Sequence, residues 1–437
     1  MQEDTHPHQH QSPAVPCESG QEPLGQAYAP MSVAHSANPY IMYARMRRAE
    51  PVFFSPRTSA WVVSRYDDVL TILKDPKRFS ISVLQIGKNR YTPAVAELMR
   101  SRPFATVPKL LDIDPPIHTR LRNSVTKAMS ASRMAGLEPR IRQFADRLID
   151  QFAPDTHLDF MQRFARPFPI LVIASLMNVP EEDLPRLHQW HNDATDLITT
   201  QPEASQQLLL AQSYVAMEQY IYDLVEQRRK APQDDLASDL LTAVDAGQAP
   251  LSVLEAANLL FLLFGAGFET SVKFLGNGLL VLLSDRAYWQ AIREKQERIP
   301  ALIEELLRFN PPSLATYRRA NQEVELGGQT IPKGAMIEVL LASADHDEAV
   351  FPAAETFDPQ RERTNRHLAF GYGIHFCLGA PLARLETRVA LEQLSQRLPS
   401  LRLVPDQEIS YTPDLLFHGV KQLLVEWDEE EKRAFPE

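Results

Sequence analysis

Along most of residues 119–300, apolar positions recur with the spacing of helices. Apolar side chains follow this period over 137–152, 168–177, 208–227 and 251–283, because one face of a helix repeats every 3.6 residues. A further helix ends at the double proline Pro311-Pro312, and the last one begins near Cys377 and runs past Leu394. We therefore expect a mainly α-helical protein.

Two regions have the composition of strands instead. Residues 52–54 and 61–63 are short β-rich runs around a turn at 55–59 and predict a hairpin. A second β-rich patch covers 324–334 and 336–341. The hairpin leads into a helix near Tyr66, with Asp67 as the expected N-cap. Residues 79–116 are weakly periodic, so we expect a long irregular segment, a feature that is commonly functional.

The ends and linkers of the chain indicate its domain organisation. Residues 1–34 are polar and predict a disordered tail that carries Cys17. Its histidines at 6, 8 and 10 allow loose metal binding, but a disordered tail is the favoured interpretation. The 437 residues suggest about three domains by length. With neither a repeat nor a linker in view, we nevertheless expect one domain over 35–437 with a small β region.

Charge and cysteine content exclude several classes of protein. The net charge of −11 argues against a nucleic-acid partner. Two cysteines exclude a disulfide framework, a four-cysteine zinc site and an iron–sulfur cluster, and fit a cytoplasmic protein. The N-terminus lacks a signal sequence. The longest apolar run, 259–268, is shorter than the roughly 20 residues that span a bilayer. We expect a soluble protein without a membrane partner.

The second cysteine lies in an unusual segment, because residues 370–381 read FGYGIHFCLGAP. Gly371 and Gly373 allow a tight backbone that approaches a flat ligand closely. A helix follows Cys377 directly, and a helix N-terminus lowers the pKa of a thiol toward the metal-binding thiolate. Since neither Cys nor His lies at zinc spacing, this thiolate fits a metal whose other ligands belong to a cofactor, such as haem iron. The alternative is a buried structural cysteine.

The segment 259–271, LLFLLFGAGFETS, predicts a helix that is apolar nearly all round and therefore buried. Gly265 and Gly267 weaken such a helix, and Glu269 and Thr270 add an acid and an alcohol beside them. One interpretation is a local opening for dioxygen and water, with the acid and the alcohol relaying protons. The other is a kinked core helix in which Thr270 bonds to a carbonyl one turn earlier. The residues alone leave both open.

The run Phe-Gly-x-Gly-x-His-x-Cys-x-Gly resembles the haem signature of the cytochrome P-450 family, the haem-thiolate monooxygenases, and the resemblance extends over about residues 35–427. It implies the cytochrome P-450 fold, with haem b buried between the central helix and the helix after the cysteine. By this resemblance Cys377 is the axial iron ligand, His375 meets a propionate and Gly379 belongs to the cofactor site. The segment AGFET resembles the oxygen-activation stretch, which makes Glu269 and Thr270 catalytic.

The resemblance also assigns supporting residues. Phe268 is bulkier than the usual residue of the oxygen-activation stretch and is expected to alter the pocket shape or the water path. Glu305 and Arg308 resemble the Glu-x-x-Arg helix, which pairs with an arginine after Phe-Asp-Pro, here Arg361, in a structural ion network. Glu304 lies one position off this spacing and is expected to be solvated.

Three basic residues resemble the family's propionate-binding positions. His118 and Arg122 are four apart on one helix face. Arg318 precedes the strand at 324–327, and Arg319 is the alternative if the register slips by one. Two propionates inside a protein need positively charged partners.

The implied activity is monooxygenation of a hydrophobic small molecule, by hydroxylation or epoxidation with dioxygen. Electrons are expected from a separate ferredoxin and ferredoxin reductase, which dock near Arg120, Lys127, Arg366 and Arg384. The expected pocket is mostly apolar, which indicates a hydrophobic substrate; terpenoid, steroid, polyketide and fatty acyl compounds stay open. Its residues are Val83, Leu84, Phe104, Leu263, Ala266, Gly267, Ser313, Leu314, Thr316, Leu416 and Phe417.

Two other functions compete with this one. A peroxygenase would use hydrogen peroxide and often lacks the acid–alcohol pair, so Glu269 and Thr270 argue against it. A haem sensor or carrier without enzymatic activity needs neither a proton relay nor a large apolar pocket.

Overall fold

A computed structural model describes residues 22–82, 91–199, 202–243 and 250–428. The predicted pocket residues Val83 and Leu84, like Cys17 and the three tail histidines, lie outside these ranges. The described helices are α1 (Leu24–Ala27), α2 (Val33–Ala37), α3 (Tyr40–Ala49), α4 (Tyr66–Lys74), α5 (Pro93–Ser101), α6 (Ile117–Ala128), α7 (Ala131–Phe152), α8 (Pro167–Leu176), α9 (Leu184–Thr199), α10 (Ala204–Lys230), α11 (Leu236–Thr242), α12 (Val253–Ser284), α13 (Arg286–Glu294), α14 (Ile299–Phe309), α15 (Leu341–Ala344) and α16 (Ala380–Arg397).

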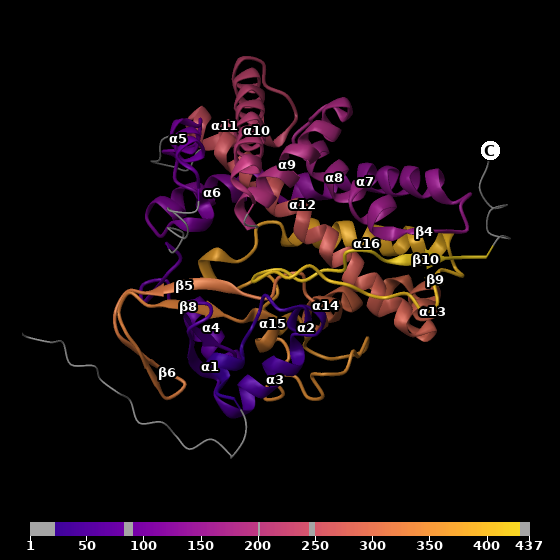
Figure 1. Ribbon diagram of the computed structural model, residues 1–437. Coiled ribbons are helices and arrows are strands. Elements are labelled where there is room, and N and C mark those ends of the chain that lie inside the picture. Colours follow the sequence, from indigo (N-terminus) through magenta and orange to yellow (C-terminus); the bar gives the residue numbers. More distant parts are fainter. Residues whose placement is uncertain (1–21, 83–90, 200–201, 244–249, 429–437) are drawn as a thin grey trace, which may run out of the picture.

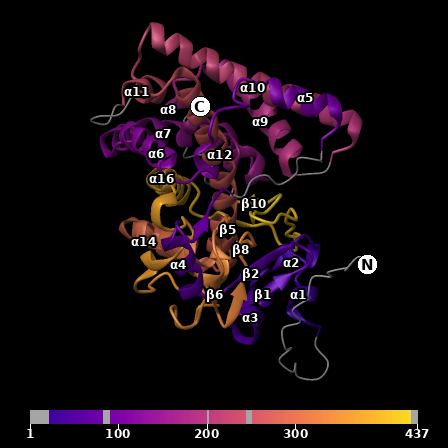
Figure 2. The same ribbon diagram turned by 90° about the vertical axis from the view of Figure 1, so that its left-hand side faces the viewer.

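The strands are short and few by comparison. They are β1 (Val52–Ser55), β2 (Ala60–Val63), β3 (Phe79–Ser80), β4 (His157–Asp159), β5 (Thr316–Ala320), β6 (Val324–Leu326), β7 (Gln329–Ile331), β8 (Met336–Val339), β9 (Arg402–Leu403) and β10 (Leu424–Glu426). Figures 1 and 2 show the helices α5–α12 in the upper part of the molecule and the main sheet with α1–α4 in the lower part. The expected mainly helical fold with a small β region is confirmed.

The five-stranded sheet has the order β1-β2-β8-β5-β3. The predicted hairpin is confirmed, with Val52 opposite Val63. Strand β8 joins β2 in parallel and β5 in antiparallel register, and Arg318 lies opposite Ile337. Successive residues of a strand point to opposite faces, so β5 buries Arg318 (4% exposed) and leaves Arg319 partly exposed. This alternation favours Arg318 over Arg319 as the buried arginine.

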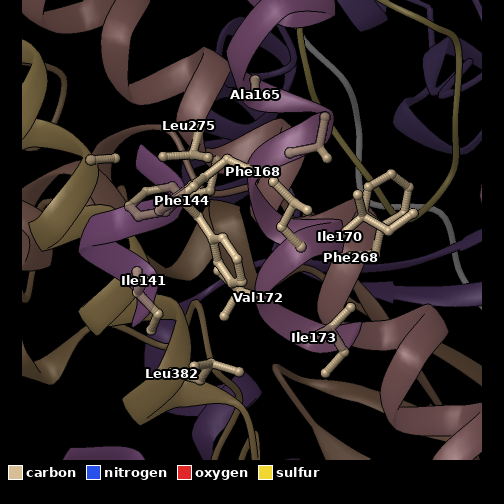
Figure 3. Close-up of a cluster of buried hydrophobic side chains, with 14 of the residues drawn as sticks. Ile141, Phe144, Ala165, Phe168, Ile170, Val172, Ile173, Phe268, Leu275 and Leu382 are labelled. Carbon is tan, nitrogen blue, oxygen red and sulfur yellow. The ribbon is translucent and has the colours of Figure 1, made fainter. Parts of the chain in front are cut away.

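Helix α12 lies inside the helical part of the molecule. It begins with a capping box between Ser252 and Glu255, and α8, α10, α14 and α16 pack against it. Figure 3 shows Phe268 and Leu275 of α12 among core residues such as Phe168 and Ile173, with Leu382 of α16 nearby. Within the described ranges α12 is the helix long and apolar enough to span a membrane, and its neighbours show why it is apolar here.

Three local expectations are wrong. Residues 22–34 are not disordered, because α1 and part of α2 form there and both Leu24 and Tyr28 are buried. Helix α4 begins at Tyr66 with Arg65 in the N-cap position, so Asp67 lies in the first turn, where its charge still favours the helix dipole. The segment 79–116 is not wholly irregular, because it contains β3 and α5 and the 3₁₀ turn η1 (Leu110–Asp112).

Candidate functional site

The Cys377 loop joins the 3₁₀ turn η6 (Gly373–His375) to α16. The Cys377 amide donates to the Phe370 carbonyl at 2.9 Å, and the amides of Gly379 and Ala380 hydrogen-bond to the thiol. Burial raises the pKa of this thiol, although the two amides and the Arg122 charge act in the opposite direction. The predicted lowering of its pKa by the helix N-terminus is therefore wrong: the amides point at the sulfur as expected, but burial outweighs them.

Two glycines of the loop are required by its backbone conformation and by its packing. Gly371 and Gly373 have φ of 69° and 75°, in the left-handed region that favours glycine. A Cβ on Gly373 would lie 2.6 Å from the Leu73 carbonyl oxygen, so the loop packs directly on the end of α4. At Gly379 a Cβ would make only an ordinary 3.8 Å contact with the Cys377 sulfur. The sequence predicted that these glycines let the backbone approach a flat ligand. At Gly373 the close neighbour is instead the end of α4.

Four basic groups from three elements lie beside this loop. The rings of His118 (α6) and His375 are 4.2 Å apart, and an Arg122 guanidinium nitrogen donates to the Phe376 carbonyl at 2.5 Å. Arg318 donates to the Thr316 hydroxyl at 3.1 Å and to the Tyr317 carbonyl at 2.7 Å.

These groups lack acidic partners at hydrogen-bond distance among the described residues. Both ring nitrogens of His118 and Nε2 of His375 are buried without a hydrogen-bond partner there. Burial lowers the pKa of His375 to about 3, and the charges of His118, Arg318 and Arg122 add to the effect. Burial also lowers the pKa of Arg318 to about 10, while Asp114 acts in the other direction. Two arginines grouped with two imidazoles whose ring nitrogens lack partners in the described ranges fit the carboxylates of an anionic group such as haem.

The segment 266–270 of α12 presents two different faces. The Thr270 hydroxyl donates to the Ala266 carbonyl at 2.8 Å, the bond expected for a kinked core helix. Ala266 is exposed in the middle of this helix, between the buried residues Phe264 and Phe268. Gly267 faces Ile173 of α8, since a Cβ there would lie 3.5 Å from its side chain. Glu269 forms an ion pair with Lys273 one turn later.

Phe268 points away from the Ala266 face. It is fully buried and packs edge-on against His188 and His191 of α9, with ring centroids 5.4 and 5.2 Å away. The expectation that its bulk changes the pocket shape is therefore wrong. The bulk lies between α12 and α9.

The predicted ion network forms in full. Arg308 donates to both carboxylate oxygens of Glu305 at 2.7 and 2.8 Å, and Arg361 donates to Oε1 at 3.0 Å. The amide of Asp358 donates to the same oxygen at 3.0 Å. Arg308 also donates to the carbonyls of Asp345 and Ala354 and is 0% exposed. The network joins α14 to the segments that lead to the cysteine loop.

The prediction that Glu304 is solvated is wrong. Arg384 of α16 donates to its two oxygens at 2.7 and 2.8 Å, and His367 lies at 3.2 Å. Burial raises the pKa of Glu304, but the bonds from Arg384 and His367 outweigh it and lower the pKa to about 2. The adjacent acids of α14 therefore bind two different segments. Glu305 binds the loop that contains Arg361, and Glu304 binds α16, the helix after the cysteine.

The sequence analysis also missed Glu386, a buried acid on α16. Burial raises the pKa of Glu386 to about 8, with a partly compensating hydrogen bond from Ser271 of α12. One of its oxygens has no partner among the described residues. Leu382, Glu386 and Ala390 follow one another at intervals of four residues and all are buried, so an acid inside an apolar stripe was the available signal.

The structure brings some of the predicted pocket residues together. Ser313 and Phe417 form an isolated antiparallel β-bridge, and the Leu314 amide donates to the Leu416 carbonyl at 2.7 Å. Leu314 itself is buried in the N-terminal core, with Leu416 packed against that cluster. Thr316 accepts from Arg318, and Leu263 is partly buried on α12.

Phe104 lies in a different environment. It is fully buried against Phe261, with the ring centroids 6.0 Å apart, and its amide donates to Glu218 at 3.2 Å. Phe104 and Leu314 are thus core residues, and their assignment to the pocket is wrong.

The predicted docking charges are not equivalent. Arg120 is paired with Glu255, and Arg384 with Glu304. Lys127 and Arg366 are exposed, and the Arg366 guanidinium lies 5.7 Å from the Tyr66 ring centroid. Lys127 and Arg366 are thus the more exposed of the four.

Comparison with known proteins agrees with this geometry. The family model described as cytochrome P-450 matches residues 88–418. Cytochrome P-450 107B1 of Saccharopolyspora erythraea is 39% identical over 394 residues, which cover 88% of this chain and 93% of the relative. A mycinamicin IV hydroxylase/epoxidase of Micromonospora griseorubida is 37% identical over 88% of this chain and 94% of its own length.

A solved structure supports the same assignment. The haem domain of a Tepidiphilus thermophilus cytochrome P-450 superimposes with a TM-score of 0.87 at 29% identity, over 93% of this chain and 98% of that one. The chain therefore belongs to the cytochrome P-450 family of monooxygenases, whose cofactor is haem b held by an axial cysteine thiolate.

Proposed function

We propose that Cys377 supplies the axial thiolate and that His118, Arg122, Arg318 and His375 hold the haem propionates. The observation that carries this proposal is the partly buried Cys377 thiol with two amides directed at it, next to two arginines and two histidines whose ring nitrogens lack partners in the described ranges. Arg122 links the two parts, since it bonds to the residue before the cysteine and its charge acts on the thiol. Gly379 completes the site through its amide.

When bound, the haem supplies the binding and cleavage of dioxygen, which a thiolate ligand favours. The chain itself supplies protons. Thr270, now bonded to Ala266, presents a hydroxyl on the exposed face of α12, and Glu269 is the adjacent acid. We assign to these two residues the transfer of protons toward the oxygen substrate. The pair favours a monooxygenase over a peroxygenase or a haem carrier.

The proposed substrate is a hydrophobic small molecule of the macrolide or polyketide kind. The support comes from apolar candidate lining residues and from the relative that is named a mycinamicin IV hydroxylase/epoxidase. Leu263, Ala266, Thr316 and Phe417 stay in the proposed pocket, together with Ser313. Val83 and Leu84 are proposed to join them from outside the described residues.

Electrons are proposed to come from a ferredoxin and its reductase, with the protein soluble in the cytoplasm. Exposed Lys127 and Arg366 are the proposed contacts for an acidic donor. A hollow of about 260 Å³, lined in part by Glu304, Arg384 and Arg388, lies between α14 and α16 and includes the predicted docking charge Arg384.

Turnover with labelled dioxygen tests the function. Macrolides and other apolar compounds are first screened by the change in haem spin state, and a compound that produces it is turned over with a ferredoxin system. We expect one atom of labelled dioxygen in the product. Full turnover with peroxide but none with the ferredoxin system would instead establish the peroxygenase, and no turnover in either system with any spin-shifting compound would favour the carrier.

A further inference from the structure

Two histidines of α9 lie against the segment of α12 that contains Glu269. His188 and His191 are one turn apart, and both meet the edge of Phe268. His191 also meets Phe264 at 6.0 Å, and its Cε1 lies 3.5 Å from the position of a Cβ on Gly265. The close packing at Gly265 thus places the His191 ring directly on α12.

Both imidazoles carry a buried nitrogen without a hydrogen-bond partner in the described part of the chain. Nε2 of His188 and Nε2 of His191 are the atoms concerned, and the His191 side chain is 92% buried, since 8% is exposed. Leaving such a group unpaired in the interior costs free energy. His35 in the N-terminal core has the same property, and what distinguishes the two histidines of α9 from it is the charge of Glu269 beside them.

Glu269 follows Phe268 directly on α12, and its charge acts on both rings. Burial lowers the pKa of His191 to about 4. The charge of Glu269 raises this pKa, and His188 lowers it further. Burial lowers the pKa of His188, and the charge of Arg166, which lies directly before α8, lowers it further. The charge of Glu269 raises it. Lys273 completes the charged surroundings through its ion pair with Glu269. Both imidazoles are therefore mainly neutral near pH 7.

A neutral imidazole has one donor and one acceptor nitrogen. It gives a proton from one nitrogen while it takes a proton at the other, and its net charge does not change. His188 is partly exposed and His191 is buried, so the two rings lead from the surface of α9 inward to α12.

We propose that His188 and His191 are positioning residues that bring protons from solvent to Glu269. In each cycle an imidazole N–H bond breaks, the Glu269 carboxylate takes the proton, and the opposite nitrogen takes another from the solvent side. Phe268 holds both rings edge-on, which gives the bulky residue of this segment a role. The inference rests on the proposed role of Glu269 as a proton donor.

A matched control lies elsewhere in the molecule. His35 is also 8% exposed, burial lowers the pKa of His35 to about 4, and its Nε2 is unpartnered among the described residues. It packs edge-on against Tyr28 and Tyr43, each at 5.5 Å, in the N-terminal core. His35→Phe therefore reports what the loss of a buried histidine does away from Glu269.

The first experiment tests the geometry without turnover. Histidine ring signals of the haem-loaded protein are titrated by NMR in the wild type and in Glu269→Gln. We expect the titration midpoint of His188 to fall in the variant and that of His35 to stay unchanged. An unchanged His188 midpoint would mean that Glu269 does not face this ring, which overturns the route.

The second experiment measures oxygen consumption in H₂O and D₂O with a plant-type ferredoxin, its reductase and NADPH. We expect His188→Phe/His191→Phe to slow consumption at least about tenfold and to raise the solvent isotope effect, as Glu269→Gln does. Adding Glu269→Gln to the double variant should cause no further loss. His35→Phe should match the wild type. The single variants His188→Gln and His191→Gln give the same readout if the double variant does not retain haem.

The outcomes separate the two claims. Suppose that the histidine variants keep the wild-type rate and isotope effect while Glu269→Gln consumes oxygen slowly. That result overturns the route and leaves the proposed function standing. A wild-type rate in Glu269→Gln overturns the proposed role of Glu269 and the route with it. A slow histidine variant with an unchanged isotope effect shows a structural role, which also overturns the route.

Discussion

Arg384 holds Glu304 with two hydrogen bonds of 2.7 and 2.8 Å, and its guanidinium lies 4.7 Å from the centroid of the Phe370 ring. The Phe370 carbonyl in turn accepts a hydrogen bond from the Cys377 amide. One arginine therefore connects α14, α16 and the start of the cysteine loop. The arrangement gives the first acid of the Glu304-Glu305 pair its own contact with the helix that follows the cysteine loop.

Glu304→Gln should lower stability in a pH-dependent way. The pKa of Glu304 in the folded protein is about 2, below the usual 4.5 of a glutamate, so its contribution is present above pH 4.5 and is lost as pH falls toward 2. We expect a loss of about 1 kcal/mol near neutral pH, small because Arg384 is partly exposed. Urea unfolding at several pH values measures it. Arg402→Lys, at the exposed pair with Glu426, is the control, and an equal effect there would contradict the assignment.

Glu305→Gln should be more damaging than Glu304→Gln. The Glu305–Arg308 pair is almost fully buried, with side chains 1% and 0% exposed, and removal of one partner leaves an uncompensated charge at a cost of about 3–5 kcal/mol. We expect poor haem incorporation and a lower midpoint of thermal unfolding. Arg361→Lys keeps a charge at the edge of the network and should lose less. Equal losses in the two variants would show that the pair is not the centre of the network.

Gly373→Ala should destabilise the cysteine loop through a steric clash. The new Cβ would lie 2.6 Å from the Leu73 carbonyl oxygen, in addition to the strain of a positive φ, which costs about 1–3 kcal/mol. Gly328 has a similar φ of 77° with open space around its Cβ position, so Gly328→Ala measures the strain alone. Calorimetry should show the larger loss at position 373. Equal losses would mean that the contact with α4 is not what requires glycine.

Glu386→Gln should make the protein more stable in alkali. Burial raises the pKa of Glu386 from 4.5 to about 8, so the wild type loses stability as pH rises from 4.5 through 8. Glutamine is not titrated and removes this loss. We therefore expect the variant to gain on the wild type between pH 6 and pH 9 in urea unfolding. A parallel pH dependence of the two proteins would contradict a buried neutral Glu386.

The sequence predicted what depends on local pattern. The apolar period indicated α12 and α16, the β-rich runs indicated the hairpin, and the spacing around Cys377 indicated the loop. Residues joined by long-range contacts were not visible in this way. Glu304 was assigned to solvent because its partner Arg384 is 80 residues away, and the reason for Gly373 lies in the Leu73 carbonyl of a distant helix.

The direction of side chains around an apolar helix was also beyond the sequence. The bulk of Phe268 was expected to alter the pocket shape or the water path, whereas its ring packs against two histidines of α9. Burial likewise decides the pKa of the Cys377 thiol, and a helix N-terminus seen in the sequence shows only the opposing effect.

The central claim is that Cys377 is the axial ligand of the haem. The most direct measurement is the carbon monoxide difference spectrum of the reduced, haem-loaded protein in the wild type and in Cys377→Ser. The wild type should show the long-wavelength band of thiolate ligation, and the variant should lose that band even where haem is retained. A variant that keeps the long-wavelength band would contradict the account, because the iron would then have another sulfur ligand.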